Sequence, residues 1–204
     1  MARKTRRISH HPSPPAGKAN NRTREKRPFD HHVIPRFTSL QRPFDLNDDE
    51  ISIQQWYTHI CEDEFRNEQI IEDVLQCYHE GRNGVVLSLR VAHVERLAAI
   101  INQETPNVIT LTGALGTRQS KEALNYMRET LQSQNLIIVA TGPYIGEGFD
   151  EPRLDTLFLA MPISRKGTLQ QYAGRLHRLV DQKKEVRIYD YIDIHVQMLE
   201  KMYQ

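Results

Sequence analysis

Short apolar runs alternate with amphipathic segments through the second half of the chain. Runs such as Val85–Leu89 and Leu136–Ala140 are typical of strands covered on both faces of a sheet. Between the runs, apolar residues recur every three or four positions, as on one side of a helix. We expect strands at 85–89, 108–111, 136–140, 154–161 and 186–192, and helices at 93–103, 120–134, 168–179 and about 196–202. This alternation predicts an α/β fold: a mostly parallel sheet with helices on both faces.

Two further helices are expected before the first of these strands. Asp48 or Asp49 can cap the earlier helix, and Trp56 is one of its apolar positions. Gly81 has the position of a residue that ends the second helix. Residues 29–47 are interrupted by prolines and predict an irregular connector draped over a domain at 48–204.

Charge is divided unevenly along the 204 residues, although the net charge is only +1. Residues 1–28 hold nine of the 27 Lys and Arg but one acid, a charge of +8, and the remainder has −7. So basic and apolar-poor a segment cannot bury enough surface to fold alone, so we expect a flexible tail. It either contacts phosphate backbone nonspecifically or only aids solubility.

The cysteine count and the length of the apolar runs indicate the cellular compartment. Two cysteines, Cys61 and Cys77, are too few for a disulfide framework and lack metal-ligand spacing. No apolar run approaches the ~20 residues that span a bilayer. These features predict a cytoplasmic protein with neither membrane association nor a metal site.

Loops that follow the strands are the places to search for a ligand site, because ligands of open parallel sheets collect at that edge. The loop at 141–150 is the longest and richest in glycine. Its G-x-x-x-G-x-G spacing departs from the dinucleotide-binding fingerprint, and Pro143 removes a backbone donor. A dehydrogenase-like enzyme is therefore disfavoured, and the alternatives are another ligand loop or a structural turn.

The helix at 168–179 carries a pair of arginines on one face. Arg175 and Arg178 lie three residues apart, with Gln171 one turn earlier. A guanidinium keeps its charge and donates a fork of hydrogen bonds that suits phosphate oxygens. Taken alone, the stretch also fits a solvated helix face with a capping box at 168–171.

The chain has no phosphate loop of its own. Gly17-Lys18 lies in the basic tail and is followed by Ala19 rather than Ser or Thr. No acidic pair follows an apolar strand to hold Mg²⁺. The domain can therefore contact a nucleotide through its arginines, but it has no loop that would bind the phosphates.

In this order, the motifs resemble the C-terminal RecA-like half of superfamily 2 helicases, in the branch of DEAD/DEAH-type and restriction-enzyme-like translocases. The likeness runs from about Val33 to the C-terminus. The matching segments are Val86–Arg90 (motif IV), Leu111–Gly113 with Arg118, Ile138–Thr141 with Gly146–Asp150 (motif V), Gln171–Arg178 (motif VI), and Tyr189–Asp193.

The resemblance implies roles at a nucleotide cleft between two RecA-like domains. Arg175 and Arg178 match the arginine-finger positions, and Gln171 matches a residue that orients the phosphates. Arginine fingers are worth about 10³–10⁵ in rate in phosphoryl transfer. Gly148 and Asp150 match residues that link the cleft to the nucleic-acid track. Gly174 belongs to motif VI and to the same nucleotide-binding set.

The resemblance also implies a nucleic-acid track. Thr141 matches the motif V hydroxyl that contacts the nucleic-acid backbone. Ser88, Arg90 and Gly113 are neighbouring candidates. The restriction-like branch favours DNA over RNA.

The first domain's motifs are absent from the sequence, so the resemblance implies half of an active site. ATP and Mg²⁺ would be held mainly by a separate phosphate-loop-bearing helicase domain, and the chain alone would not hydrolyse ATP. The alternative is a non-enzymatic nucleic-acid-binding or interaction module derived from a helicase domain.

Overall fold

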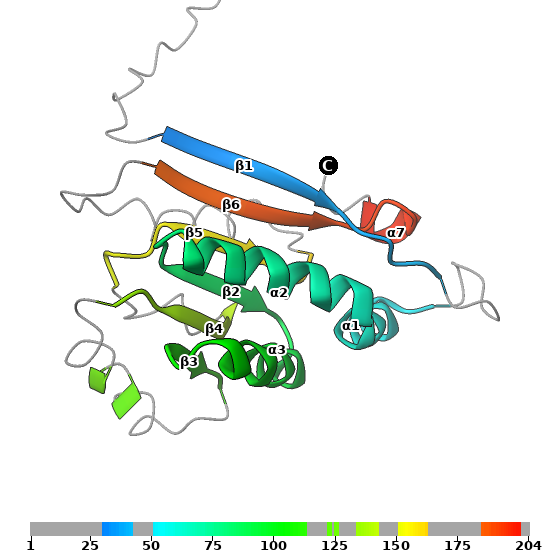
Figure 1. Cartoon of the computed structure of the whole chain (residues 1–204). Coiled ribbons are helices and arrows are strands. Elements are labelled where there is room, and N and C mark those ends of the chain that lie inside the picture. Colours follow the sequence, from blue (N-terminus) through cyan, green and yellow to red (C-terminus); the bar gives the residue numbers. More distant parts are fainter. Residues whose placement is uncertain are drawn as a thin grey trace, which may run out of the picture.

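The computed structural model describes residues 30–42, 51–113, 122–123, 125–126, 134–142, 151–162 and 185–200. These residues form a six-stranded sheet with helices against it (Figure 1). The elements are β1 (Asp30–Phe37), α1 (Ile53–Glu62), α2 (Glu64–His79), β2 (Gly84–Ser88), α3 (Val91–Glu104), β3 (Val108–Leu111), β4 (Ile137–Thr141), β5 (Thr156–Leu159), β6 (Glu185–Ile192) and α7 (Gln197–Glu200).

The sheet is parallel throughout, in the order β1-β6-β5-β2-β4-β3. Every residue of the central strands β2 and β4 is buried, which accounts for their continuous apolar runs. The predicted α/β fold is confirmed. Strands 2 to 6 lie within a few residues of the predicted ranges.

Two layers of core side chains pack on the two faces of the sheet. On one face, α2 and α3 cover Val86, Val139 and Phe158 (Figure 1). On the other, Ile138 and Leu157 belong to a second buried cluster. Helical residue Ala123 packs against this second cluster, so helical residues lie on both faces. The predicted helix at 168–179 and most of that at 120–134 lie outside the described residues.

The prediction of an irregular connector at 29–47 is wrong for residues 30–37, which form strand β1 at the edge of the sheet. β1 pairs in parallel with β6, with Val33 opposite Ile188. Its alternation is hard to recognise, because an edge strand exposes much of its surface. Pro35 is tolerated there, since a residue without an N–H can face the open edge.

The helix boundaries follow from local capping. Ser52, rather than Asp48 or Asp49, caps α1: the backbone N–H of Gln55 donates to its Oγ (3.3 Å), and its own N–H donates to Gln55 Oε1 (2.8 Å). Gly81 follows α2 with φ +86°, a conformation that favours glycine, as the sequence predicts.

A third buried cluster joins α1 and α7 at the carboxyl ends of the strands (Figure 1). Trp56 and Ile60 of α1 are fully buried there, against Leu40, Val196 and Leu199. This packing fixes α1 beside the strand ends.

None of the described helices is both long and apolar enough to cross a bilayer.

Candidate nucleic-acid interface

All six strands run the same way, so their carboxyl ends lie along one edge of the sheet. Ser88 and Thr141 are register partners at the ends of β2 and β4. Gly113 follows β3, the strand on the other side of β4, and is exposed. Arg90 lies two residues past β2 at the start of α3. The structure therefore gathers the four residues that sequence reasoning proposed for nucleic-acid contact.

Ser88 is buried, 2% exposed, and its hydroxyl is engaged within the protein. Ser88 Oγ lies 3.0 Å from His93 Nδ1, and His93 Nε2 lies 2.8 Å from Asn67 Oδ1. Asn67 donates through Nδ2 to the carbonyl of Cys61 (3.0 Å), which leaves Oδ1 as its acceptor. Burial lowers the pKa of His93 to about 3, with Arg66 and Arg96 acting in the same direction, so the ring is neutral.

These hydrogen bonds determine which nitrogen of His93 carries the proton and where the Ser88 hydroxyl donates. A neutral imidazole carries one N–H, and the acceptor Asn67 Oδ1 places it on Nε2. Nδ1 of His93 is then an acceptor, so Ser88 donates its hydroxyl proton to it. Ser88 Oγ in turn accepts from the backbone N–H of Arg90 (3.2 Å). Ser88 therefore has no proton left for a phosphate and instead holds the backbone of Arg90.

Arg90 is half-exposed, and its guanidinium extends from the start of α3 to contact α1. Its Nη2 donates to the main-chain oxygen of Gln54 (3.4 Å) and to the side-chain oxygen of the same residue. A guanidinium has five N–H donors, and Nε and Nη1 make no bond within the described part of the chain. Arg90 thus keeps donors available while its position is fixed.

Thr141 differs from its register partner Ser88. It is 7% exposed, and its hydroxyl has no hydrogen-bond partner among the described residues. A hydroxyl without a partner at the edge of a sheet remains available to a ligand.

The solved structures that match the chain share one fold. No family model matches the chain. The C-terminal domain of the DEAD-box protein Dbp5 superposes with a TM-score of 0.53 at 13% identity, covering 87% of this chain and 86% of that domain. T4 UvsW superposes with a TM-score of 0.63 at 19% identity, covering 84% of this chain and 37% of UvsW.

The chain has the RecA-like fold of the C-terminal domain of the DEAD-box protein Dbp5. The C-terminal part of the Fun30 ATPase domain has the same fold, with a TM-score of 0.57 at 14% identity over 76% of this chain and 48% of that one.

Among sequences, the transcript termination protein A18 of fowlpox virus is 24% identical over 143 residues, 70% of this chain. A camelpox virus protein of the same name is 27% identical over 119 residues, 57% of this chain. The chain spans 30% of the fowlpox protein and 23% of the camelpox protein.

The residues that the sequence assigns to the nucleotide side lie outside the described residues. They are Gly148, Asp150, Gln171, Gly174, Arg175 and Arg178. Their roles stay predictions.

A buried ion pair supports this edge of the RecA-like domain, and sequence reasoning missed it. Arg66 of α2 and Asp193, just after β6, are both fully buried, with Nε and Oδ1 2.9 Å apart. Arg66 Nη1 also donates to the carbonyl of Ala160 after β5 (2.6 Å), and Thr38 after β1 donates to Asp193 Oδ1 (2.6 Å). One arginine thereby ties three strand ends to α2.

A second buried contact lies beside it. Asp73 of α2 accepts from Arg36 Nε of β1 (2.8 Å) and from the Tyr191 hydroxyl of β6 (3.0 Å). Burial raises the pKa of Asp73, and both partners oppose that shift. Nothing in the sequence marks Arg66 or Asp73 as buried, because charged residues on a helix usually face solvent.

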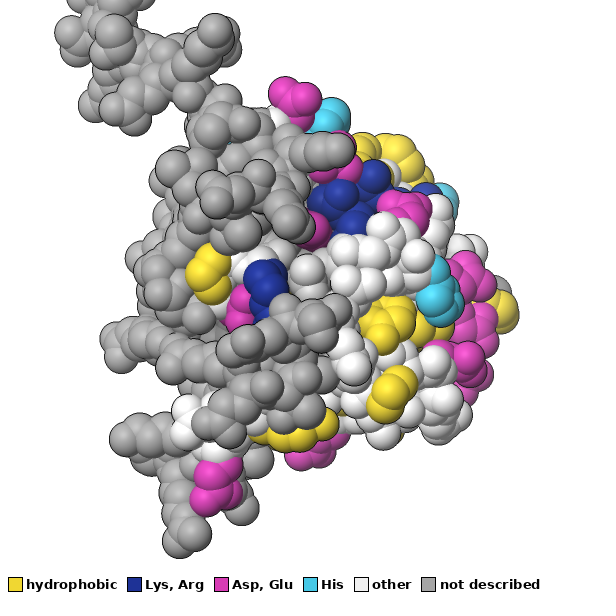
Figure 2. Space-filling model, turned by 60° about the vertical axis from the view of Figure 1, so that its left-hand side comes forward, with side chains coloured by type: hydrophobic (Ala, Val, Ile, Leu, Met, Phe, Trp, Pro, Cys, Tyr) yellow, Lys and Arg dark blue, Asp and Glu magenta, His cyan; other side chains and the backbone are white. Residues whose placement is uncertain are grey.

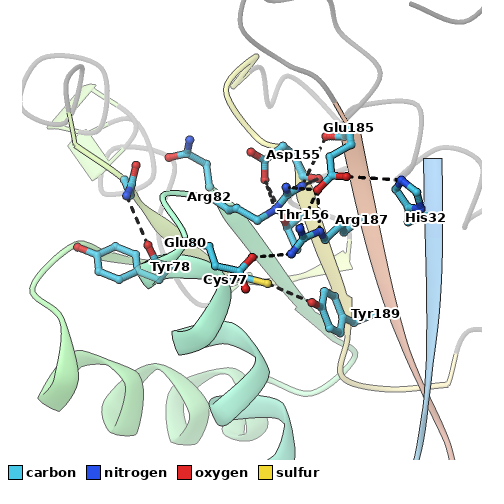
Figure 3. Close-up of polar contacts among 12 residues, drawn as sticks. His32, Cys77, Tyr78, Glu80, Arg82, Asp155, Thr156, Glu185, Arg187 and Tyr189 are labelled. Carbon is cyan, nitrogen blue, oxygen red and sulfur yellow. Dashed lines mark hydrogen bonds and ion pairs between the residues drawn. The ribbon is translucent and has the colours of Figure 1, made fainter. Parts of the chain in front are cut away.

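The opposite edge of the sheet carries an ion-pair network (Figure 3). Arg82 pairs with Glu185 (2.7 Å), and Arg187 pairs with Glu80 (2.6 Å) and Glu185 (2.8 Å). The Arg187 hydrogen bond lowers the pKa of Glu80. Burial would raise the pKa of Glu185, but Arg187 and Arg82 outweigh it and lower that pKa.

Figure 2 turns this edge forward and shows basic side chains directly beside acidic ones. The charges here are matched within the protein, so the network ties α2, β5 and β6 together. Arg90, whose Nε and Nη1 make no bond within the described part of the chain, lies at the carboxyl edge instead.

Proposed function

We propose that the chain acts as the second motor domain of an ATP-dependent superfamily 2 DNA helicase or translocase. The observation that carries the proposal is the gathering of Arg90, Gly113 and Thr141 at the carboxyl edge of a helicase-type RecA-like sheet. In this proposal, that edge faces the nucleic acid and the nucleotide cleft.

On the nucleic-acid side, Arg90 and the Thr141 hydroxyl donate to phosphate oxygens, and the exposed Gly113 lets the backbone approach closely. Ser88 supports these contacts by fixing the backbone N–H of Arg90. Such contacts position a strand without reading its sequence.

On the nucleotide side, Arg175 and Arg178 act as arginine fingers, and Gln171 orients the γ-phosphate. Gly148, Asp150 and Gly174 shape the same cleft. The fingers stabilise the charge that develops as water attacks the γ-phosphorus and ADP leaves. ATP and Mg²⁺ are held by a phosphate-loop-bearing domain, and this chain alone does not turn ATP over.

The nucleic acid we propose is DNA, because the sequence motifs are most similar to the restriction-enzyme-like branch. The poxvirus relatives are named transcript termination proteins. The proposed DNA substrate therefore includes a duplex that is being transcribed. RNA is the alternative, and a direct comparison of matched DNA and RNA strands decides between them.

The test mixes the purified chain with a first RecA-like domain from a superfamily 2 helicase, Mg²⁺-ATP and DNA. We expect phosphate release to rise only when both proteins are present. DNA binding without any such stimulation, by first domains from several relatives, would instead favour the non-enzymatic binding module.

A further inference from the structure

α1 lies beside the candidate nucleic-acid interface, although no motif assigns it a role there. Its buried side, with Trp56 and Ile60, is fixed in the third core cluster at the carboxyl ends of the strands (Figure 1). Its capping box fixes the first turn. The helix therefore presents its other side chains in defined positions.

Gln54, in the first turn of α1, contacts Arg90 directly. Arg90 Nη2 donates both to the main-chain oxygen of Gln54 (3.4 Å) and to its side-chain oxygen. These bonds join residues 36 positions apart, so they set the guanidinium against an independent element. A long arginine side chain held this way loses less conformational entropy when it binds a phosphate.

Among the described residues, both side chains keep donors that make no hydrogen bond. With its oxygen occupied by Arg90, the Gln54 amide still has two N–H donors, and it makes no other hydrogen bond among the described residues. Gln54 is exposed, and Arg90 is half-exposed. Uncommitted donors from two elements thus lie side by side on the surface.

Tyr57, one turn further along α1, lies on the same side of the helix as Gln54. Its ring packs against the third core cluster, and burial raises the pKa of its hydroxyl while the charge of Arg90 opposes the shift. That hydroxyl has no partner in the part of the chain that the structure describes. α1 therefore adds a neutral donor near the same guanidinium.

We propose that α1 forms a second wall of the nucleic-acid site, in which Gln54 positions Arg90 and donates its own amide to the sugar-phosphate backbone. The inference rests on the proposed function and extends it to a helix outside the helicase motifs. Because Gln54 acts largely through Arg90, it is chiefly a positioning residue.

A double-mutant cycle tests this on the full chain. The affinity for a short fluorescent single-stranded DNA is measured by anisotropy at several salt concentrations, for wild type, Gln54→Ala, Arg90→Ala and the double variant. We expect Gln54→Ala to weaken binding on the order of fivefold. Arg90→Ala should lower the salt slope by about one phosphate contact. In the Arg90→Ala background, Gln54→Ala should have a much smaller effect.

Gln54→Glu sharpens the test, because it keeps an acceptor for Arg90 but places a negative charge beside the phosphate. It should weaken binding more than Gln54→Ala. Gln103→Ala and Gln103→Glu, at an exposed position of α3, are matched controls and should bind like wild type. None of these substitutions is unfavourable in a helix.

The outcomes separate the two proposals. If Arg90→Ala weakens binding and Gln54→Ala does not, or if the two effects simply add, the role of α1 is overturned and the proposed function stands. If Arg90→Ala binds like wild type, the assigned nucleic-acid track itself fails.

Discussion

His93 determines the hydrogen-bonding roles of the residues at the carboxyl edge, and its ionisation should be visible in stability. Burial lowers its pKa from 6.5 to about 3 in the folded chain. Between these values the unfolded chain binds the extra proton. The contribution of His93 to the free energy of unfolding is therefore complete above about pH 6.5. It falls by up to ~1.4 kcal/mol per pH unit as the pH drops toward 3.

Urea unfolding at pH 7 and pH 5 measures this effect. His93→Gln should remove that part of the pH dependence, and the exposed His79→Gln should leave it intact. Equal pH dependence in wild type and His93→Gln would show that His93 is not held neutral by the fold.

Ser88 and Thr141 are register partners with opposite expected behaviour. Ser88→Ala leaves the buried Nδ1 of His93 without a donor, so it should lower the free energy of unfolding by about 1–3 kcal/mol. Thr141→Val removes a hydroxyl that has no partner among the described residues, so stability should change by less than about 0.5 kcal/mol while DNA affinity falls several-fold. Denaturant titration and anisotropy on both variants check this; the reverse pattern would exchange their roles.

The positions of single residues at the candidate interface could be predicted from the sequence, but their partners could not. Ser88, Arg90 and Gly113 are expected at this edge because Ser88 ends a strand and the other two follow one. The bonds to His93 and Gln54 depend on how α1, α2 and α3 pack, which local spacing does not encode.

At the scale of elements, the attachment of α2 to the strand ends should depend on one buried ion pair. Arg66→Met leaves the Asp193 carboxylate buried without its counter-charge, so we expect stability to fall by about 3–5 kcal/mol. Combining it with Asp193→Asn should cost less than the sum of the two single effects. Denaturant unfolding measures the coupling, and strictly additive effects would contradict it.

The elements themselves were predictable wherever the pattern was strong. β2 and β4 are apolar because both faces are covered, and Gly81 ends α2 because its positive φ requires a glycine. β1 was missed because an edge strand with an exposed Val33 and an interior Pro35 resembles a loop. Its place depends on pairing with β6, more than 150 residues later, a contact that no local pattern reveals.

For the whole molecule, the uneven charge predicts a salt-dependent contribution from residues 1–28. Replacing their nine Lys and Arg by Gln should reduce the slope of log affinity against log salt by about 0.7 for each single-strand phosphate that these residues neutralise. Anisotropy titrations between low and moderate salt measure the slope. An unchanged slope would leave the segment only a role in solubility.

The proposed arginine fingers within residues 171–178 can be tested by reconstituting the nucleotide cleft. A separately purified first RecA-like domain is titrated with the chain or with its Arg178→Ala or Arg178→Lys variant, and DNA-dependent phosphate release is followed. We expect saturable stimulation by the wild-type chain and a fall of at least about 10³-fold with either substitution, while DNA affinity is unchanged. Equal stimulation by wild type and Arg178→Ala, or steady ATP turnover by the chain alone, would contradict it.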